Sequence, residues 1–198
     1  MAIATLINNP STARQFSFEV LPPLKGTGTD RLFADLEQLC RLNPAFINIT
    51  THHSEFVYRE LPDGKFERQS VRRRPGTIAV AAAIREKFGV TVQPHVICSG
   101  ATVEQTEYEL LDLQFLGITD LLLLRGDKAR DDRQFRPTPG GHAHTTDLIR
   151  QVMAFNNGRF ADGTPIENPG RPFDIGVACY PEKHEVSKVE SGKLIFVI

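Results

Sequence analysis

Apolar runs typical of β-strands alternate along the chain with segments of helical periodicity. The runs predict strands at 16–20, 46–50, 90–97, 118–124 and 173–179. Helical spacing of apolar residues, together with terminating residues, predicts helices at 30–42, 77–88, 102–116 and 147–155. Thr29 is the expected N-cap of the first of these helices, and Thr102 and Gln105 have the spacing of a capping box at the start of the third. Residues 51–75 show no clean period, which predicts either a functional loop or a short element that the pattern does not reveal. Strand and helix therefore alternate strictly, and this order favours a parallel β/α architecture.

Two local features bear on the architecture, the first on parallel strands and the second on an open sheet as the competing fold. Residues 121–124 are apolar at every position, as in a parallel strand buried on both faces. An open doubly wound sheet would normally carry a glycine-rich phosphate loop after its first strand, whereas the first predicted strand ends in Leu21-Pro22-Pro23. The absence of this loop favours a β/α barrel.

Composition narrows the class of protein. The chain has 198 residues, of which 40% are hydrophobic and 24% charged, the balance of a soluble globular protein. No apolar run approaches the roughly 20 residues of a membrane span, and the N-terminus lacks the pattern of a secretory signal. The formal net charge of −1 argues against nucleic acid as a partner. Three scattered cysteines fit reduced thiols in a cytoplasmic protein.

Polar residues gather at or near the carboxyl end of every predicted strand. They are Glu19, Thr50, Thr51, His95, Arg125, Gly126, Asp127 and Tyr180. In a β/α barrel this face carries the active site, assembled from several strands. A carboxyl at the barrel mouth can have a raised pKa and act as a general acid, which makes Glu19 the sharpest candidate.

Each candidate also has a plainer interpretation. Glu19 can lie on a solvated strand face, and His95 can be a histidine satisfied within the core. The histidines at 52–53, 142 and 144 lack the further ligands of a metal site, so no metal is expected. The arginines at 68 and 72–74 are typical of a solvated face, with contact to an anionic ligand as the alternative.

The ordered motifs resemble methylenetetrahydrofolate reductase. They are Phe16-Ser17-Phe18-Glu19 with Pro22-Pro23, Asn48-Ile49-Thr50, Pro94-His95, Leu124-Arg125-Gly126-Asp127, and Tyr180-Pro181-Glu182 with His184. The resemblance implies a (β/α)8 TIM-barrel fold, of which about five of the eight β/α units are present in this chain. It also implies that the barrel binds FAD without a covalent link. Reduced nicotinamide passes hydride to the flavin, and 5,10-methylenetetrahydrofolate is then reduced to 5-methyltetrahydrofolate, in one-carbon metabolism and methionine biosynthesis.

The resemblance also implies roles for individual residues. Glu19 would be the general acid that opens the five-membered ring of the folate, and Asp127 would lie beside both flavin and folate. The FAD contacts would come from Thr50, Thr51, His95, Arg125, Gly126, Asp127, Tyr180 and His184, with His144 and Thr145 aligned to a tyrosine–alanine pair in the family. The sequence does not distinguish NADH from NADPH and leaves a homo-oligomer open.

The resemblance stops near Glu185. We expect residues 1–185 to form a partial reductase barrel and residues 186–198 to be an aberrant tail from a truncated or frame-shifted gene. Five strands cannot close an eight-stranded barrel, so an inactive remnant of the enzyme is the alternative function. Another barrel enzyme acting on a pterin or phosphorylated substrate is a third possibility.

Overall fold

The structure is a computed structural model that describes residues 2–8, 15–52, 55–128 and 133–178. Five parallel strands form one sheet, in the order β1 (Ser17–Val20), β2 (Phe46–Ile49), β5 (Val92–Ile97), β6 (Asp120–Leu124) and β7 (Asp174–Val177). Four helices connect these strands, namely α2 (Asp30–Cys40), α3 (Thr77–Phe88), α4 (Val103–Leu116) and α5 (Thr145–Asn156). The five strands and four helices predicted from the sequence are therefore confirmed, with ends that shift by a few residues.

The strand order identifies the sheet as part of a barrel. Each strand lies beside the next β/α strand of the chain, so every crossover moves in the same direction. Since parallel crossovers are right-handed, such an order places all the helices on one face of the sheet. A doubly wound sheet would instead reverse direction part-way and carry helices on both faces. The fold is thus α/β, with the parallel sheet of the TIM-barrel class.

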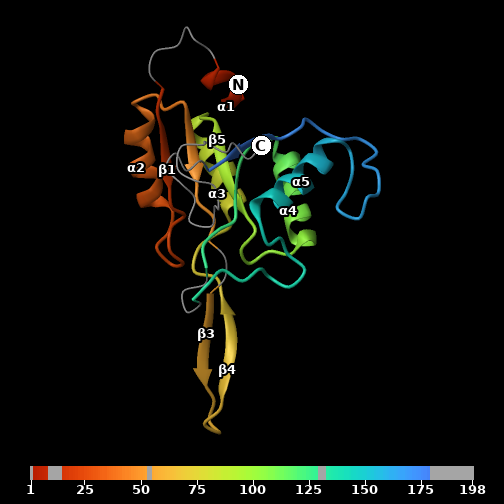
Figure 1. Ribbon diagram of the computed structural model, residues 1–198. Coiled ribbons are helices and arrows are strands. Elements are labelled where there is room, and N and C mark those ends of the chain that lie inside the picture. Colours follow the sequence, from red (N-terminus) through yellow and green to blue (C-terminus); the bar gives the residue numbers. More distant parts are fainter. Residues whose placement is uncertain (1, 9–14, 53–54, 129–132, 179–198) are drawn as a thin grey trace, which may run out of the picture.

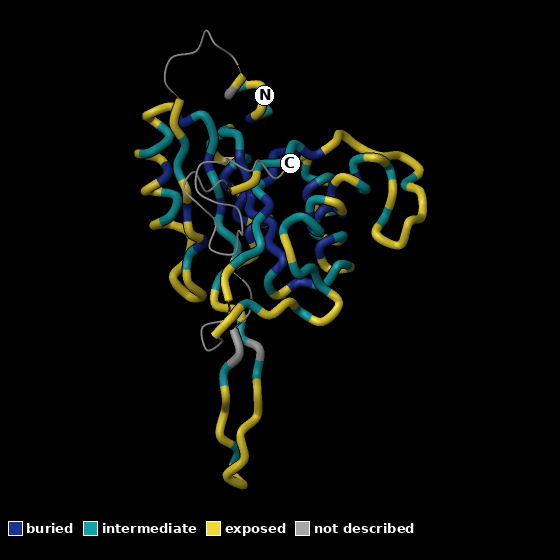
Figure 2. The backbone as a smooth tube through the Cα atoms, in the orientation of Figure 1, coloured by how far each residue is buried: buried dark blue, intermediate teal, exposed yellow. Residues whose placement is uncertain are grey.

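The core lies between this sheet and its helices. Ile49 and Leu121 point to the helix layer and are fully buried, as are Leu36 of α2, Ile84 of α3 and Leu148 of α5. Figure 2 shows the buried residues concentrated in the central strands and on the helix sides that meet them. The capping box predicted for Thr102 and Gln105 is present, whereas Thr29 occupies its predicted N-cap position without a side-chain hydrogen bond.

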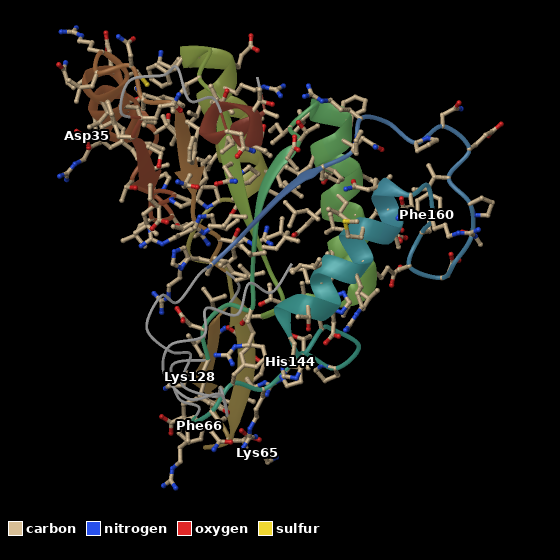
Figure 3. The ribbon with its side chains drawn as sticks, turned by 45° about the horizontal axis from the view of Figure 1, so that its top comes forward. Asp35, Lys65, Phe66, Lys128, His144 and Phe160 are labelled. Carbon is tan, nitrogen blue, oxygen red and sulfur yellow. The ribbon has the colours of Figure 1, made fainter. Side chains whose placement is uncertain are left out.

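The segment 51–75 contains regular structure. β3 (Glu55–Glu60) and β4 (Phe66–Val71) form an antiparallel hairpin, so the expectation of a hidden short element is confirmed. Figure 1 shows the hairpin projecting away from the body of the molecule, and Figure 3 places Lys65 and Phe66 at its far end. Since the hairpin follows β2, it marks the end of the sheet at which the strands reach their carboxyl ends.

A short helix that the sequence did not predict lies at the opposite end. In α1 (Ile3–Ile7), the side chain of Ile3 is buried, and the Ile3 backbone N–H donates to Asp120 Oδ1 over 2.7 Å. Asp120 is the first residue of β6, so this contact places α1 beside the amino end of the sheet, away from the hairpin (Figure 1). No helix in the described part of the chain is both long and apolar enough to cross a bilayer.

Candidate active site at the carboxyl ends of the strands

The sheet places most of the predicted site residues at one end. Glu19 lies in β1, Thr50 and Thr51 follow β2, His95 lies in β5, and Arg125, Gly126 and Asp127 follow β6. The register pairs Glu19 with Asn48 and Asn48 with Gln93, so these three residues share one level and one face of the sheet. This face is the one turned away from Ile49 and Leu121, and in a barrel it is the interior.

Glu19 and His95 face each other across β2. Their closest atoms, Glu19 Oε2 and His95 Nε2, are 3.6 Å apart, although the two residues differ sharply in environment. The Glu19 side chain is 60% exposed, whereas that of His95 is only 7% exposed. Burial lowers the pKa of His95, the Glu19 carboxylate raises it, and His52 lowers it. Burial is the largest effect, so the imidazole is held in its neutral form near neutral pH.

Hydroxyl groups bind the end of β2 to the start of α3. Thr51 Oγ1 lies 2.8 Å from Thr77 Oγ1 and also donates to the backbone carbonyl of His95. Thr77 Oγ1 lies 3.1 Å from the carbonyl of Thr50, to which it can donate. The two hydroxyls supply two protons for three contacts, so they form a shared network. Its effect is to fix the strand ends on either side of the histidine.

The end of β6 is fixed by close packing and by an aromatic contact. Gly126 has a φ of +81°, and a Cβ atom placed there would lie 2.8 Å from Ser99 Cβ. Ser99 Oγ donates to the Asp127 carbonyl over 3.3 Å, and the Arg125 guanidinium lies 4.8 Å from the centroid of the Phe135 ring. Only glycine combines this backbone conformation with so close an approach. The charged groups of Arg125 and Asp127 are thereby presented at the strand ends.

The loop that follows covers the neighbouring β5–α4 connection. The Gly100 N–H donates to Thr138 Oγ1 over 3.0 Å, and the Val103 N–H donates to the Gly140 carbonyl over 2.9 Å. This loop leads to His144, the exposed residue that precedes α5, and to Thr145, the first residue of the helix. Figure 3 shows Lys128 and His144 at the end of the sheet from which the hairpin projects. His144 thus lies at the candidate end of the sheet, and Thr145 follows it directly in the chain.

Comparison with known proteins decides the family. The sequence profile of the family described as Methylenetetrahydrofolate reductase matches residues 4–197 of the chain. The chain belongs to the methylenetetrahydrofolate reductase family. It is 26% identical over 169 residues to "Methylenetetrahydrofolate reductase (NADH) 1" of Arabidopsis thaliana, covering 85% of this chain and 24% of the plant protein.

Bacterial relatives match over a similar length. The "5,10-methylenetetrahydrofolate reductase" of Pectobacterium carotovorum is 26% identical over 181 residues, covering 90% of this chain and 48% of the relative. That of Escherichia coli is 25% identical over 180 residues, again covering 90% of this chain and 48% of the relative. The chain thus spans about a quarter of the length of the plant relative and about half the length of the bacterial ones.

The sequence motifs of the reductase family did not lead to every residue of the site. Thr77 is buried and central to the hydroxyl network, yet the sequence pattern suggested only that it begins a helix. Arg74, grouped with a solvated arginine cluster, donates to the carbonyl of Pro22 and so fixes the base of the hairpin to the β1–α2 loop. Tyr180, His184 and the segment 186–198 lie outside the described residues.

The residues at this face fit the flavin cofactor that the reductase family generally uses. A dinucleotide carries a negative pyrophosphate, for which Arg125 offers a cation already oriented by its contact with Phe135. Gly126 brings backbone close to neighbouring strands, and the threonine hydroxyls and histidines supply further polar groups. In the described part of the chain no group of three or more His, Cys, Asp or Glu side chains is arranged to hold a metal ion.

Proposed function

We propose that this chain takes part in the flavin-dependent reduction of 5,10-methylenetetrahydrofolate to 5-methyltetrahydrofolate by NAD(P)H. The observation that carries the proposal is Glu19 beside buried His95, at the mouth where the polar strand ends meet. Membership of the reductase family supports the substrate class. We place the reaction in one-carbon metabolism and methionine biosynthesis in the cytoplasm.

FAD would be held by residues from four of the five strand ends. The proposed contacts in the described chain are Thr50, Thr51, His95, Arg125, Gly126, Asp127, His144 and Thr145. Tyr180 and His184 are proposed contacts beyond the described residues. When bound, FAD supplies the carrier for the electron pair that arrives from NAD(P)H and leaves to the folate.

Glu19 would act as the general acid. Its proton goes to a nitrogen of the folate's five-membered ring, and the bond from that nitrogen to the one-carbon unit breaks, with the electron pair retained by the nitrogen. The carbon is left as an iminium that can accept hydride. Because the Glu19 carboxyl is exposed at the strand ends, an incoming folate can reach it. Asp127, also exposed, would orient the pterin.

The two half-reactions separate this proposal from its alternative. We expect Glu19→Gln to slow folate reduction by about 100- to 10,000-fold, the usual contribution of a general acid. Oxidation of NAD(P)H with a quinone acceptor should persist, since it needs no acid at Glu19. Glu60→Gln, on the exposed hairpin, is the matched control and should leave both rates unchanged.

Equal loss of both half-reactions in Glu19→Gln would contradict the assignment of Glu19 to the folate step. A folded parent chain with no flavin absorbance and neither activity would favour the non-catalytic alternative.

A further inference from the structure

We propose that His95 is the positioning residue of Glu19, with its Nε2–H donating to the carboxyl group and holding it at the mouth of the strand ends. This inference deepens the proposed function and rests on it for the role of Glu19. It gives His95 a use beyond the cofactor contact proposed above.

The first support is an unsatisfied atom. His95 Nε2 is buried and has no hydrogen-bond partner, and no other buried side-chain nitrogen or oxygen in the described residues is left in this state. Buried polar groups are nearly always hydrogen-bonded, because an unpaired group has lost its contacts with water without replacing them. The unpaired nitrogen at the candidate site therefore indicates a nearby acceptor that a small side-chain movement brings within hydrogen-bonding distance.

The second support is that Glu19 is the group in position to be this partner. Its Oε2 atom lies 3.6 Å from Nε2, slightly beyond hydrogen-bonding distance. The His95 ring is enclosed by the sheet, whereas the Glu19 side chain is mostly exposed and has room to rotate. A rotation of Glu19 about its side-chain bonds closes the gap without moving the backbone of either strand.

The backbone around His95 makes the direction of its ring difficult to change. The His95 carbonyl accepts a hydrogen bond from Thr51 Oγ1, and β5 is buried along its whole length. The register places Leu122 of β6 beside His95, on the side away from β2. The ring is thus fixed by β2 and β6, and its free nitrogen is directed to Glu19 of β1.

The charge state suits this role. The ionisable groups that act on His95 are Glu19 and His52, and their effects on its pKa oppose each other. Burial keeps the ring neutral, so His95 can donate a hydrogen bond to Glu19 without placing a full positive charge beside it. An imidazolium there would stabilise the carboxylate, which is the form that has no proton to donate. A neutral donor orients the carboxyl group without adding a positive charge beside it.

The direct test is an NMR titration of the histidine rings in the full chain. His95 is one of six histidines, and its signal is assigned from its loss in His95→Gln. We expect the neutral ring to carry its proton on Nε2. Glu19→Gln should lower the pKa of His95 by about half a pH unit or more, because a neighbouring carboxylate is removed. Glu60→Gln should leave that pKa unchanged. A proton on Nδ1, or a His95 pKa that ignores Glu19→Gln, overturns the proposal.

A second measurement separates positioning from simple packing. In His95→Gln the amide nitrogen can take the place of Nε2 and still donate to Glu19, whereas His95→Leu offers no donor. We expect folate reduction to be about 3- to 10-fold faster in His95→Gln than in His95→Leu, the value of one hydrogen bond to a neutral carboxyl group. Equal rates in the two variants contradict the positioning role.

The two measurements also distinguish this inference from the function on which it rests. The titration needs neither folate nor flavin, so coupling between His95 and Glu19 can be established without any turnover. If the titration shows coupling but Glu19→Gln still reduces folate at the full rate, Glu19 is not the general acid. The hydrogen bond between His95 and Glu19 would nevertheless be supported.

Discussion

Thr51 Oγ1 and Thr77 Oγ1 lie 2.8 Å apart and join the end of β2 to the first turn of α3. Thr77 is buried, and its hydroxyl also reaches the Thr50 carbonyl. We predict that Thr77→Val lowers the free energy of unfolding by about 1–2 kcal/mol, since the variant has no hydroxyl and the Thr50 carbonyl loses the donor that Thr77 provides. Urea denaturation followed by circular dichroism measures the change.

Thr27→Val is the matched control for this prediction. The Thr27 hydroxyl donates to the Leu24 carbonyl over 2.7 Å, but in a turn exposed to water that can replace the bond. We expect this variant to change stability by less than about 0.5 kcal/mol. If the two variants behave alike, the buried network contributes nothing beyond an ordinary surface hydroxyl.

Gly126→Ala tests how closely the end of β6 packs. Gly163 provides the control, because its φ of +87° resembles the +81° of Gly126 but no atom lies within 4 Å of the position of its Cβ. Both variants bear the cost of a left-handed backbone, and only Gly126→Ala must also displace Ser99. We predict that Gly126→Ala is destabilised by roughly 1–3 kcal/mol more than Gly163→Ala. Equal shifts in their thermal midpoints would show that the strand end accommodates a methyl group.

The sheet was predictable because its strands and helices each have a clear periodic pattern. Thr102 and Gln105 form the expected capping box, and Leu121 lies where an apolar run predicted a buried strand. The hairpin was not recognised, because none of its residues whose burial the structure describes is buried, and so no buried face imposes a pattern. Tyr58 and Phe66 are both more than 60% exposed, and charged residues occur on both strands. The five-residue helix α1 is too short for periodicity to indicate.

The candidate site was predicted in part for a similar reason. Glu19 and His95 could be found because a polar residue inside an apolar strand stands out in the sequence. Thr77 could not, because a threonine at the start of a helix has an ordinary local explanation. Its importance depends on Thr51, which is 26 positions away in the chain. Contacts of this kind are set by the packing of elements rather than by local pattern.

The buried carboxyl group of Asp120 should make the stability of the fold depend on pH. Burial raises the pKa of its carboxyl, an effect that the Ile3 N–H opposes and Asp174 reinforces. A raised folded-state pKa means that the folded protein holds this proton more tightly than the unfolded chain does. The free energy of unfolding therefore falls as the pH rises from about 3.8 through the raised pKa, because the buried carboxyl loses its proton over this range. Above the raised pKa it stays at the lower value.

We predict that Asp120→Asn is more stable than the parent chain at pH 7, because the amide oxygen still accepts from Ile3 and no charge is buried. The gain should vanish as the pH falls to about 3.8 and below, where the parent carboxyl is protonated in both states. Urea midpoints at several pH values measure it. Asp35→Asn, on the exposed side of α2 (labelled in Figure 3), should show no comparable gain. A destabilised Asp120→Asn at pH 7 would mean that the charge itself is needed.

Asp127 predicts a property of the bound flavin under the proposed function. Asp127 is exposed at the end of β6, so its carboxylate should disfavour added electron density on a neighbouring flavin. At roughly 4 Å in a water-like medium the repulsion is about 1 kcal/mol, or about 20 mV for a two-electron couple. We therefore predict that Asp127→Asn raises the flavin midpoint potential by about this amount, as measured by equilibration with a reference dye.

Asp112→Asn, on the exposed side of α4, is the control and should leave the flavin midpoint potential unchanged. An unchanged or lowered potential in Asp127→Asn would mean that the Asp127 carboxylate lies away from the flavin. Its proposed role would then be limited to orienting the pterin.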